Sequence, residues 1–207
     1  MRDIDNLGKW ALRMLQVAIA CEVILVLHTA ALIAFWQNVI PVEYAETIDS
    51  SGEFVSVTYL AVIVVCYVVC GRWIYRASFN AAIMNPHSER ITPGWAVGWF
   101  AVPIFSLWKP YQAMRQTWNS TFHSSSDMDA PAPSMLGWWW AGWVIMTVMG
   151  QISLRMTMNG SEDSYATSLW VDLAGFPVAV AATLLFMQIV QRVTAAQTRD
   201  NVQDTFA

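Results

Sequence analysis

A carboxylate, Glu22, lies within the first long apolar stretch of this chain. A charge inside a membrane costs about 3 kcal/mol or more unless it is neutralised or paired, so such a residue is a candidate for function. Arg72 and Arg76, at the end of the next apolar stretch, fall at a similar depth. We therefore expect a structural pair of Glu22 with Arg72 or Arg76, and a proton or ion relay is the alternative.

Asp172 and His28 are two further polar side chains inside apolar stretches. Asp172 falls near the depth of Arg155, and we expect a structural pair there too. His28 is the only histidine within an expected span, whereas haem held by two histidines would need a second one. We therefore expect His28 to form a hydrogen bond between helices rather than to ligate a haem or pigment.

Sulfur-containing residues offer possible ligands for soft metals. Cys66 and Cys70 share one helix face, and Cys21 lies at a comparable depth. Cysteine is also an ordinary small apolar residue, and a thiolate in lipid is costly. The methionines that cluster toward the other side are Met146, Met149, Met156 and Met158. Packing explains both groups, and we expect no bound metal and no cofactor.

Enzyme signatures are missing from the sequence. It has no phosphate-binding loop and no G-x-S-x-G, H-E-x-x-H or C-x-x-C motif. An enzyme acting on lipid at the membrane surface would need His87 or His123 beside a carboxylate in a groove. We favour a protein that is not an enzyme.

The apolar residues are concentrated in four runs, 14–37, 55–75, 136–154 and 167–190. With 56% hydrophobic and 13% charged residues, the chain is too apolar for a soluble domain. Each run approaches the roughly 20 residues that a spanning helix needs, and only a helix satisfies its own backbone there. We expect an all-α integral membrane protein with four transmembrane helices in a single domain, 1–207.

The lysines and arginines are distributed unequally between the two sides of this topology. With the N-terminus inside, only Arg155 of the 11 lies outside. This bias predicts a bacterial inner-membrane protein with both termini cytoplasmic. The ten inner cations are spaced along helix ends, which favours anionic lipid headgroups over nucleic acid.

Between the second and third runs lies a different kind of sequence. Residues 93–108 are uncharged but short and interrupted by Pro103, which predicts a re-entrant or interfacial segment on the cytoplasmic side. Residues 109–122 have the spacing of an amphipathic helix, 123–135 are a polar linker, and 194–207 are a polar tail. Ser50, Ser51 and Gly52 indicate a turn in the outer loop 38–54.

Most tryptophans fall on the cytoplasmic side. One interpretation is an aromatic belt at the headgroups. The other is a surface that binds a partner or anionic lipid, because aromatic residues are enriched at binding hot spots. The residues expected in this surface are Trp95, Trp99, Trp108, Lys109, Arg115, Trp118, Trp138 and Trp139.

One stretch of about 45 residues resembles a known family. It contains Arg72-Trp73-Ile74-Tyr75-Arg76-Ala77, then Pro93-Gly94-Trp95-Ala96-Val97-Gly98-Trp99-Phe100, then Leu107-Trp108-Lys109-Pro110-Tyr111-Gln112. These motifs resemble the bacterial membrane family called domain of unknown function 4328. The resemblance implies a multi-pass membrane protein and supplies no activity and no catalytic residue.

The leading hypothesis is a non-enzymatic scaffold or accessory subunit. It would bind anionic lipid, a partner membrane protein or a second copy of itself through the aromatic and basic surface. The alternative is a small transporter or channel that uses Glu22, Asp172 and His28.

Overall fold

The computed structural model describes residues 3–86, 90–123 and 130–206, with side chains as far as residue 199. All regular elements in these residues are helices. The four long ones are α1 (Asp5–Trp36), α2 (Ala45–Met84), α5 (Ser134–Met158) and α6 (Glu162–Phe206). The all-α class predicted from the apolar runs is confirmed for this part of the chain.

Three helical segments are long and apolar enough to cross a membrane: Asp5–Trp36, Val42–Met84 and Glu162–Arg199. The second combines the short helix η1 (Val42–Tyr44) with α2. Helix α5 is not among the three, because four tryptophans, three glycines and the polar Gln151 and Arg155 lower its hydropathy. These three helices make the chain a membrane protein. A fourth crossing, through α5, is a separate proposal.

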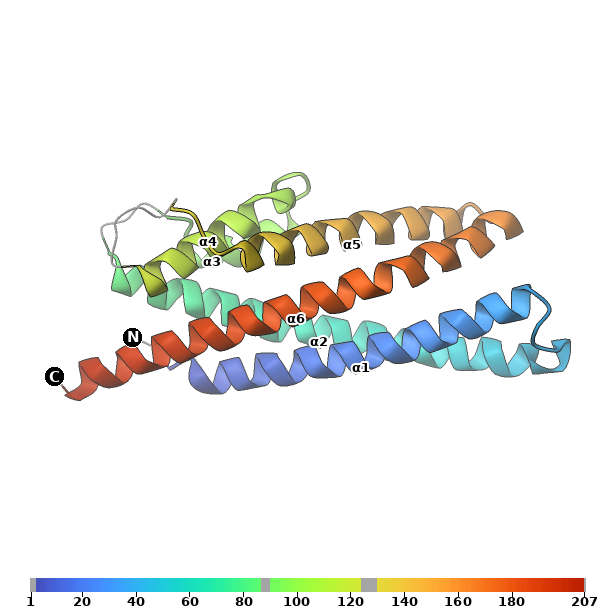
Figure 1. Cartoon of the computed structure of the whole chain (residues 1–207), viewed down its shortest axis with the longest axis horizontal. Coiled ribbons are helices and arrows are strands. Elements are labelled where there is room, and N and C mark those ends of the chain that lie inside the picture. Colours follow the sequence, from blue (N-terminus) through green and yellow to red (C-terminus); the bar gives the residue numbers. More distant parts are fainter. Residues whose placement is uncertain (1–2, 87–89, 124–129, 207) are drawn as a thin grey trace.

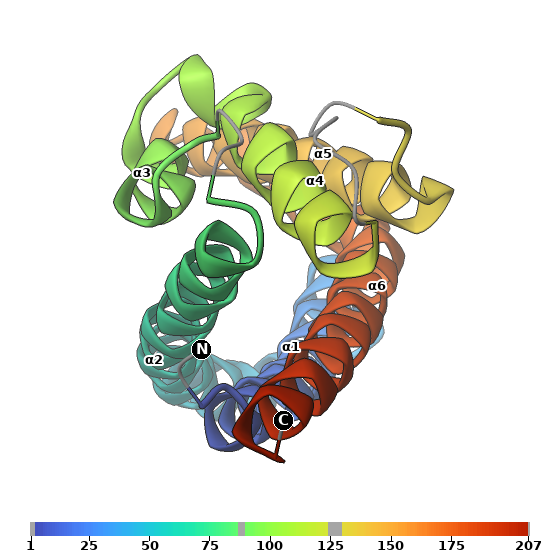
Figure 2. The same ribbon diagram turned by 90° about the vertical axis from the view of Figure 1, so that its left-hand side faces the viewer.

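The four long helices run side by side along the longest axis of the molecule (Figure 1). Helix α1 packs on both α2 and α6, and α6 packs on α5, whereas α2 and α5 hardly touch. Seen from the end that holds both termini, the bundle is therefore a horseshoe with its gap between α2 and α5 (Figure 2).

A short hairpin and a helix lie at the end of the bundle that holds the termini (Figures 1 and 2). The hairpin comprises α3 (Pro93–Gly98), η2 (Trp99–Ala101) and η3 (Phe105–Leu107), and α4 (Lys109–Phe122) follows it. Helix α3 packs on α2, while α4 packs on α2, α5 and α6. The hairpin and α4 thus cover one end of the gap.

Part of the buried core lies where α2, α4 and α6 meet. Trp73, Ile189 and Val193 are fully buried, and the Trp73 indole Nε1 donates a hydrogen bond to Thr194 Oγ1 at 3.0 Å. The Gln197 amide donates to the Ala77 carbonyl at 3.1 Å and to the Thr121 hydroxyl at 2.9 Å. Because Asn80 also donates to Gln197 Oε1 at 3.3 Å, buried polar groups join α2, α4 and α6.

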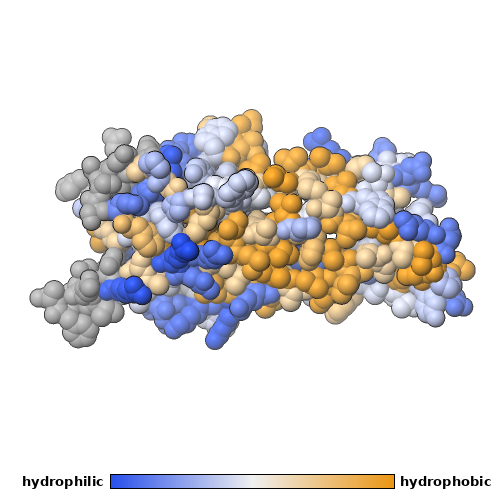
Figure 3. Space-filling model, in the orientation of Figure 1, coloured by the Kyte–Doolittle hydropathy of each residue, from blue (hydrophilic) through white to orange (hydrophobic). Residues whose placement is uncertain are grey.

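The surface divides into zones along the same axis (Figure 3). Polar residues occupy both ends, and an apolar band lies between them. Exposed apolar side chains within the long helices include Leu27 on α1, Val64 on α2 and Val148 on α5. Such a contiguous apolar surface suits a helix bundle surrounded by lipid.

The turn predicted at Ser50, Ser51 and Gly52 is wrong, because α2 already begins at Ala45. The two serine hydroxyls donate to the carbonyls of Thr47 and Ile48 one turn earlier, at 3.2 Å and 2.9 Å. Both hydroxyls therefore form hydrogen bonds with backbone carbonyls of their own helix.

Candidate functional site

The hairpin exposes a row of aromatic rings. Trp95 stacks on Trp99 at 4.5 Å between ring centroids, Trp99 lies 5.2 Å from Phe105, and Phe105 lies 5.3 Å from Trp108. Trp95 is 51% exposed. Lys109 follows at the start of α4, where its ammonium donates to Gln112 at 3.1 Å. The structure therefore brings together four of the eight residues expected in a binding surface.

The other four are divided between surface and core. Trp138 is 70% exposed, and Arg115 is half-buried on α4. Trp118 and Trp139 are only 6% and 4% exposed, because α4 and the start of α5 pack against other helices. The exposed aromatic and basic surface therefore contains fewer tryptophans than the sequence predicted.

Helix α4 buries polar residues as well as apolar ones. Gln116 accepts a hydrogen bond from the Ile91 amide at 2.9 Å, and Arg90 donates to the Ser120 hydroxyl at 3.2 Å. Burial lowers the pKa of Arg90. The segment before α3 is therefore fastened to α4 by specific bonds.

The inner face of the hairpin packs into the bundle through Phe100. Its ring lies edge-on to Trp140 and Trp143, at 6.0 Å and 5.6 Å. The Trp140 indole donates to the Leu107 carbonyl at 2.8 Å, which fixes the hairpin to α5. Trp139 continues the aromatic contacts by stacking on Phe186 of α6 at 5.2 Å.

Glu22 is buried, with 8% of its surface exposed, and its Oε2 atom has no hydrogen-bond partner among the described residues. Arg76 instead donates to the Asp3 carbonyl at 3.0 Å. Within the described part of the chain the sole ion pair is Lys9–Asp5, at 2.6 Å. The prediction that Glu22 pairs with Arg72 or Arg76 is therefore wrong.

The expected pair of Asp172 with Arg155 is also not formed in the described structure. His28, in contrast, does join two helices. Its Nε2 lies 3.0 Å from the Ile48 carbonyl of α2, so the ring donates a hydrogen bond there. Gly52 makes room for the ring, since a Cβ atom at this position would lie 2.7 Å from it.

Two cysteines lie together on α2, with Cys66 Sγ and Cys70 Sγ 3.9 Å apart. Both are buried, and Cys21 is half-buried on α1. Among the described residues, no three histidine, cysteine or acidic side chains are grouped as metal ligands. His123 directly follows α4, and His87 lies outside the described residues.

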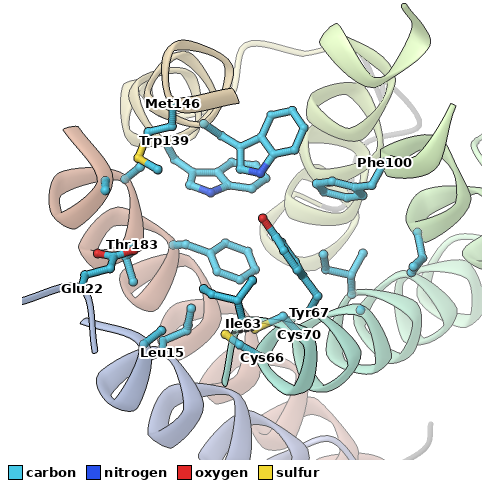
Figure 4. Close-up of a pocket in the computed structure, with 18 of the residues that line it drawn as sticks. Leu15, Glu22, Ile63, Cys66, Tyr67, Cys70, Phe100, Trp139, Met146 and Thr183 are labelled. Atoms are coloured by element: carbon cyan, nitrogen blue, oxygen red, sulfur yellow. Dashed lines mark hydrogen bonds between the residues drawn. The ribbon is translucent and has the colours of Figure 1, made fainter. Parts of the chain in front are cut away.

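A cavity of about 550 Å³ lies inside the horseshoe, between α2 and α5, which hardly touch (Figure 4). Its back wall is formed by Leu15, Ala18 and Glu22 of α1 and by Ala179, Ala182, Thr183 and Phe186 of α6. Residues from Tyr59 to Ile74 of α2 form one side, and Trp139, Trp143 and Met146 of α5 form the other. The hairpin closes one end through Val97, Phe100 and Ala101.

A second cavity of about 320 Å³ adjoins the first. The two share Glu22, Tyr59, Met146 and Ala179. The second extends toward Thr29 and Asp172, but His28 lines neither. Glu22 therefore lies where the two cavities meet.

Sequence reasoning found Glu22 but missed the cavity around it. One signal was present: Ala179, Ala182 and Phe186 lie on a single helical face, as do Leu15, Ala18 and Glu22. Small residues on those faces leave space that the aromatic side chains opposite do not fill. This pattern could have indicated a cavity, although not which helices enclose it.

Comparison with known proteins identifies a family whose function is not assigned. No curated protein and no solved structure matches the chain. The model of a family described as a domain of unknown function, DUF4328, matches residues 37–195, which include α2 to α5, the hairpin and most of α6. Because this match covers well over half of the sequence, the chain belongs to the DUF4328 family.

Proposed function

We propose that the chain crosses the bacterial inner membrane four times, through α1, α2, α5 and α6, with both termini cytoplasmic. Both termini lie at one end of the bundle, as an even number of crossings requires (Figure 1). Helix α5 has 25 residues, enough to span. A cysteine placed at Ser125 should stay unlabelled by a maleimide confined to the periplasm, and labelling there would refute this topology.

Within this topology the protein is a non-enzymatic accessory protein that binds an apolar chain taken from the bilayer. The cavity between α2 and α5 carries the proposal. Its volume of about 550 Å³ falls within the range of about 300–1,000 Å³ typical of small-molecule sites. Its walls belong to the apolar stretches of α1, α2, α5 and α6, so a ligand dissolved in the lipid would enter between α2 and α5, which hardly touch.

The length of the cavity also suits a chain. Tyr59 and Ile74 both line it and are fifteen residues apart on α2, which corresponds to about 22 Å along the helix. The hydrocarbon core of a bilayer is about 30 Å thick. An apolar chain lying parallel to the lipid tails therefore fits along the groove.

The outer face of the hairpin is the second part of this proposal. Its aromatic row, Trp95, Trp99, Phe105 and Trp108, is followed by Lys109, and the hairpin lies toward the end of the bundle that holds the termini (Figure 1). Tryptophan rings favour the headgroup layer, and a cation there attracts anionic lipid by about 1 kcal/mol. We propose that this face holds anionic lipid; a partner protein or a second copy of the chain is the competing occupant.

Filling the cavity tests its role. Ile63 lies on the α2 wall, whereas Leu60, one turn away, is 63% exposed and lines neither cavity. We expect Ile63→Trp to carry fewer bound lipids per chain than the parent in mild detergent, measured by native mass spectrometry, because only the hairpin face still holds lipid, while Leu60→Trp keeps the number of the parent. Equal lipid retention in both variants and the parent would contradict binding in the cavity.

A transporter is the second candidate, because Glu22 and Asp172 line one continuous pair of cavities. It predicts ion or proton flux in liposomes that falls in Glu22→Gln and Asp172→Asn. If both variants leave the flux unchanged, this candidate is eliminated and the accessory function is unaffected.

A further inference from the structure

The carboxyl in the cavity, Glu22, lies far from the hairpin. On α1, Leu15 lines the cavity first and Glu22 follows seven residues later, which is about 10 Å further along the helix. On α2, the hairpin packs beside Gly71 through Val97. Of the α2 residues that line the cavity, Tyr59 lies farthest along the helix from Gly71, so it marks the end of the cavity away from the hairpin. The cavity lining is thus mostly apolar, with the hydroxyls of Tyr59, Tyr67 and Thr183 among it, and its one carboxyl lies at the end away from the hairpin (Figure 4).

This carboxyl needs a partner that the described structure does not supply. Glu22 Oε2 has no hydrogen bond, although the residue is more than nine-tenths buried. Leaving a buried polar group unsatisfied is destabilising, because its hydrogen bonds to water are lost and not replaced. A ligand with a hydrogen-bond donor at that depth would recover this free energy.

A phospholipid does not meet this requirement well. Its headgroup stays at the membrane surface, so a tail lying in the cavity would place a methyl group against Glu22. The complementary ligand is a molecule polar enough to donate one hydrogen bond and apolar enough to leave the headgroup layer.

We propose that the cavity binds a neutral lipophilic alcohol, with its hydroxyl donating to Glu22 and its apolar body lying between α2 and α5. This inference rests on the proposed binding of an apolar chain and adds the chemistry of its polar end. The hydroxyl supplies the missing donor without introducing a second charge into the lipid.

Three native thiols allow binding to be measured without adding a probe. Cys66 and Cys70 line the cavity, whereas Cys21 does not. We would reconstitute the full chain in lipid nanodiscs and measure N-ethylmaleimide modification of each thiol by peptide mass spectrometry. Dodecanol and dodecane are the matched ligands, compared at equal mole fraction in the bilayer, and Cys21 modification is the internal control.

We expect both ligands to slow modification of Cys66 and Cys70, with dodecanol effective at about tenfold lower mole fraction. In Glu22→Leu this preference should vanish while dodecane still protects, and removal of an unsatisfied carboxyl should leave the fold intact. Equal protection by both ligands in the parent chain would overturn the alcohol proposal alone. Protection by neither would overturn the binding of an apolar chain itself.

Dodecylammonium and dodecanoate complete the comparison. A carboxylate that recognises positive charge would favour dodecylammonium over dodecanol, and that result would overturn the assignment of a neutral alcohol. Dodecanoate should protect least, because its negative charge would be buried against the Glu22 carboxyl.

Discussion

Replacing Gly142 with alanine tests how closely α5 and α6 approach beside the cavity. A Cβ atom at Gly142 would lie 2.9 Å from the Ala182 Cβ and 3.7 Å from its Cα. Ordinary van der Waals contact begins at 3.4 Å, so the two helices would have to separate by about half an ångström. Because Ala182 lines the cavity, this shift would also move its back wall.

The same helix provides a matched control at Gly150, where an added Cβ meets nothing within 4 Å. Both substitutions gain the same helix propensity, about 1 kcal/mol for glycine to alanine, so this contribution cancels in their comparison. Only Gly142→Ala also incurs the cost of overpacking, about 1–3 kcal/mol. We therefore expect Gly142→Ala to be about 1–3 kcal/mol less stable than Gly150→Ala.

Reversible unfolding in mixed micelles of sodium dodecyl sulfate, followed by tryptophan fluorescence, measures this difference. The chain has 12 tryptophans, and Trp139, Trp140 and Trp143 lie on α5 near the substituted position. Equal free energies of unfolding for the two variants would refute the close approach of α5 and α6. A lower stability of Gly150→Ala would refute it as well.

Three further predictions follow from single contacts. Gln197→Leu removes the hydrogen bonds that join α2, α4 and α6, and should lower the free energy of unfolding in the same assay by about 2–4 kcal/mol; an unchanged value would contradict the buried network. Gly52→Ala would place a Cβ 2.7 Å from the His28 ring, and should speed amide exchange near the start of α2 by displacing that ring; exchange identical to the parent would show that the ring is not in contact. Trp140→Phe removes the donor to the hairpin carbonyl at 2.8 Å, and should increase proteolysis or exchange of the hairpin while α1 keeps its protection; equal changes in both would point to global destabilisation instead.

The helical elements were readable from the sequence because their causes are local. Runs of apolar residues select membrane helices by composition alone, and three of the described helices meet that requirement. The spacing of Tyr111, Met114 and Trp118 predicts a helix, and α4 contains all three. The resemblance to the family, noted on residues 72–112, is confirmed by the family match over residues 37–195, since residue identity at fixed spacing needs no tertiary structure.

The sequence located the acidic residues inside the bundle, but the ion-pair partners predicted for them are wrong. Depth along a helix can be counted from the sequence, and on that basis Glu22 and Arg76 are at similar depths. The direction in which a side chain points depends on the rotation of its helix against its neighbours. Arg76 contacts the Asp3 carbonyl, and Glu22 points into a cavity.

By itself, then, the sequence determined that this is a helical membrane protein of the DUF4328 family with a carboxyl within its first apolar helix. Only the tertiary structure decided that α2 and α5 stay apart, that Trp118 and Trp139 face inward, and that Glu22 lies beside a cavity. The physical reason is that lipid removes the hydrophobic drive to close a bundle. Contacts between small residues such as Gly142 and Ala182 then determine which helices meet, and those contacts join residues far apart in the sequence.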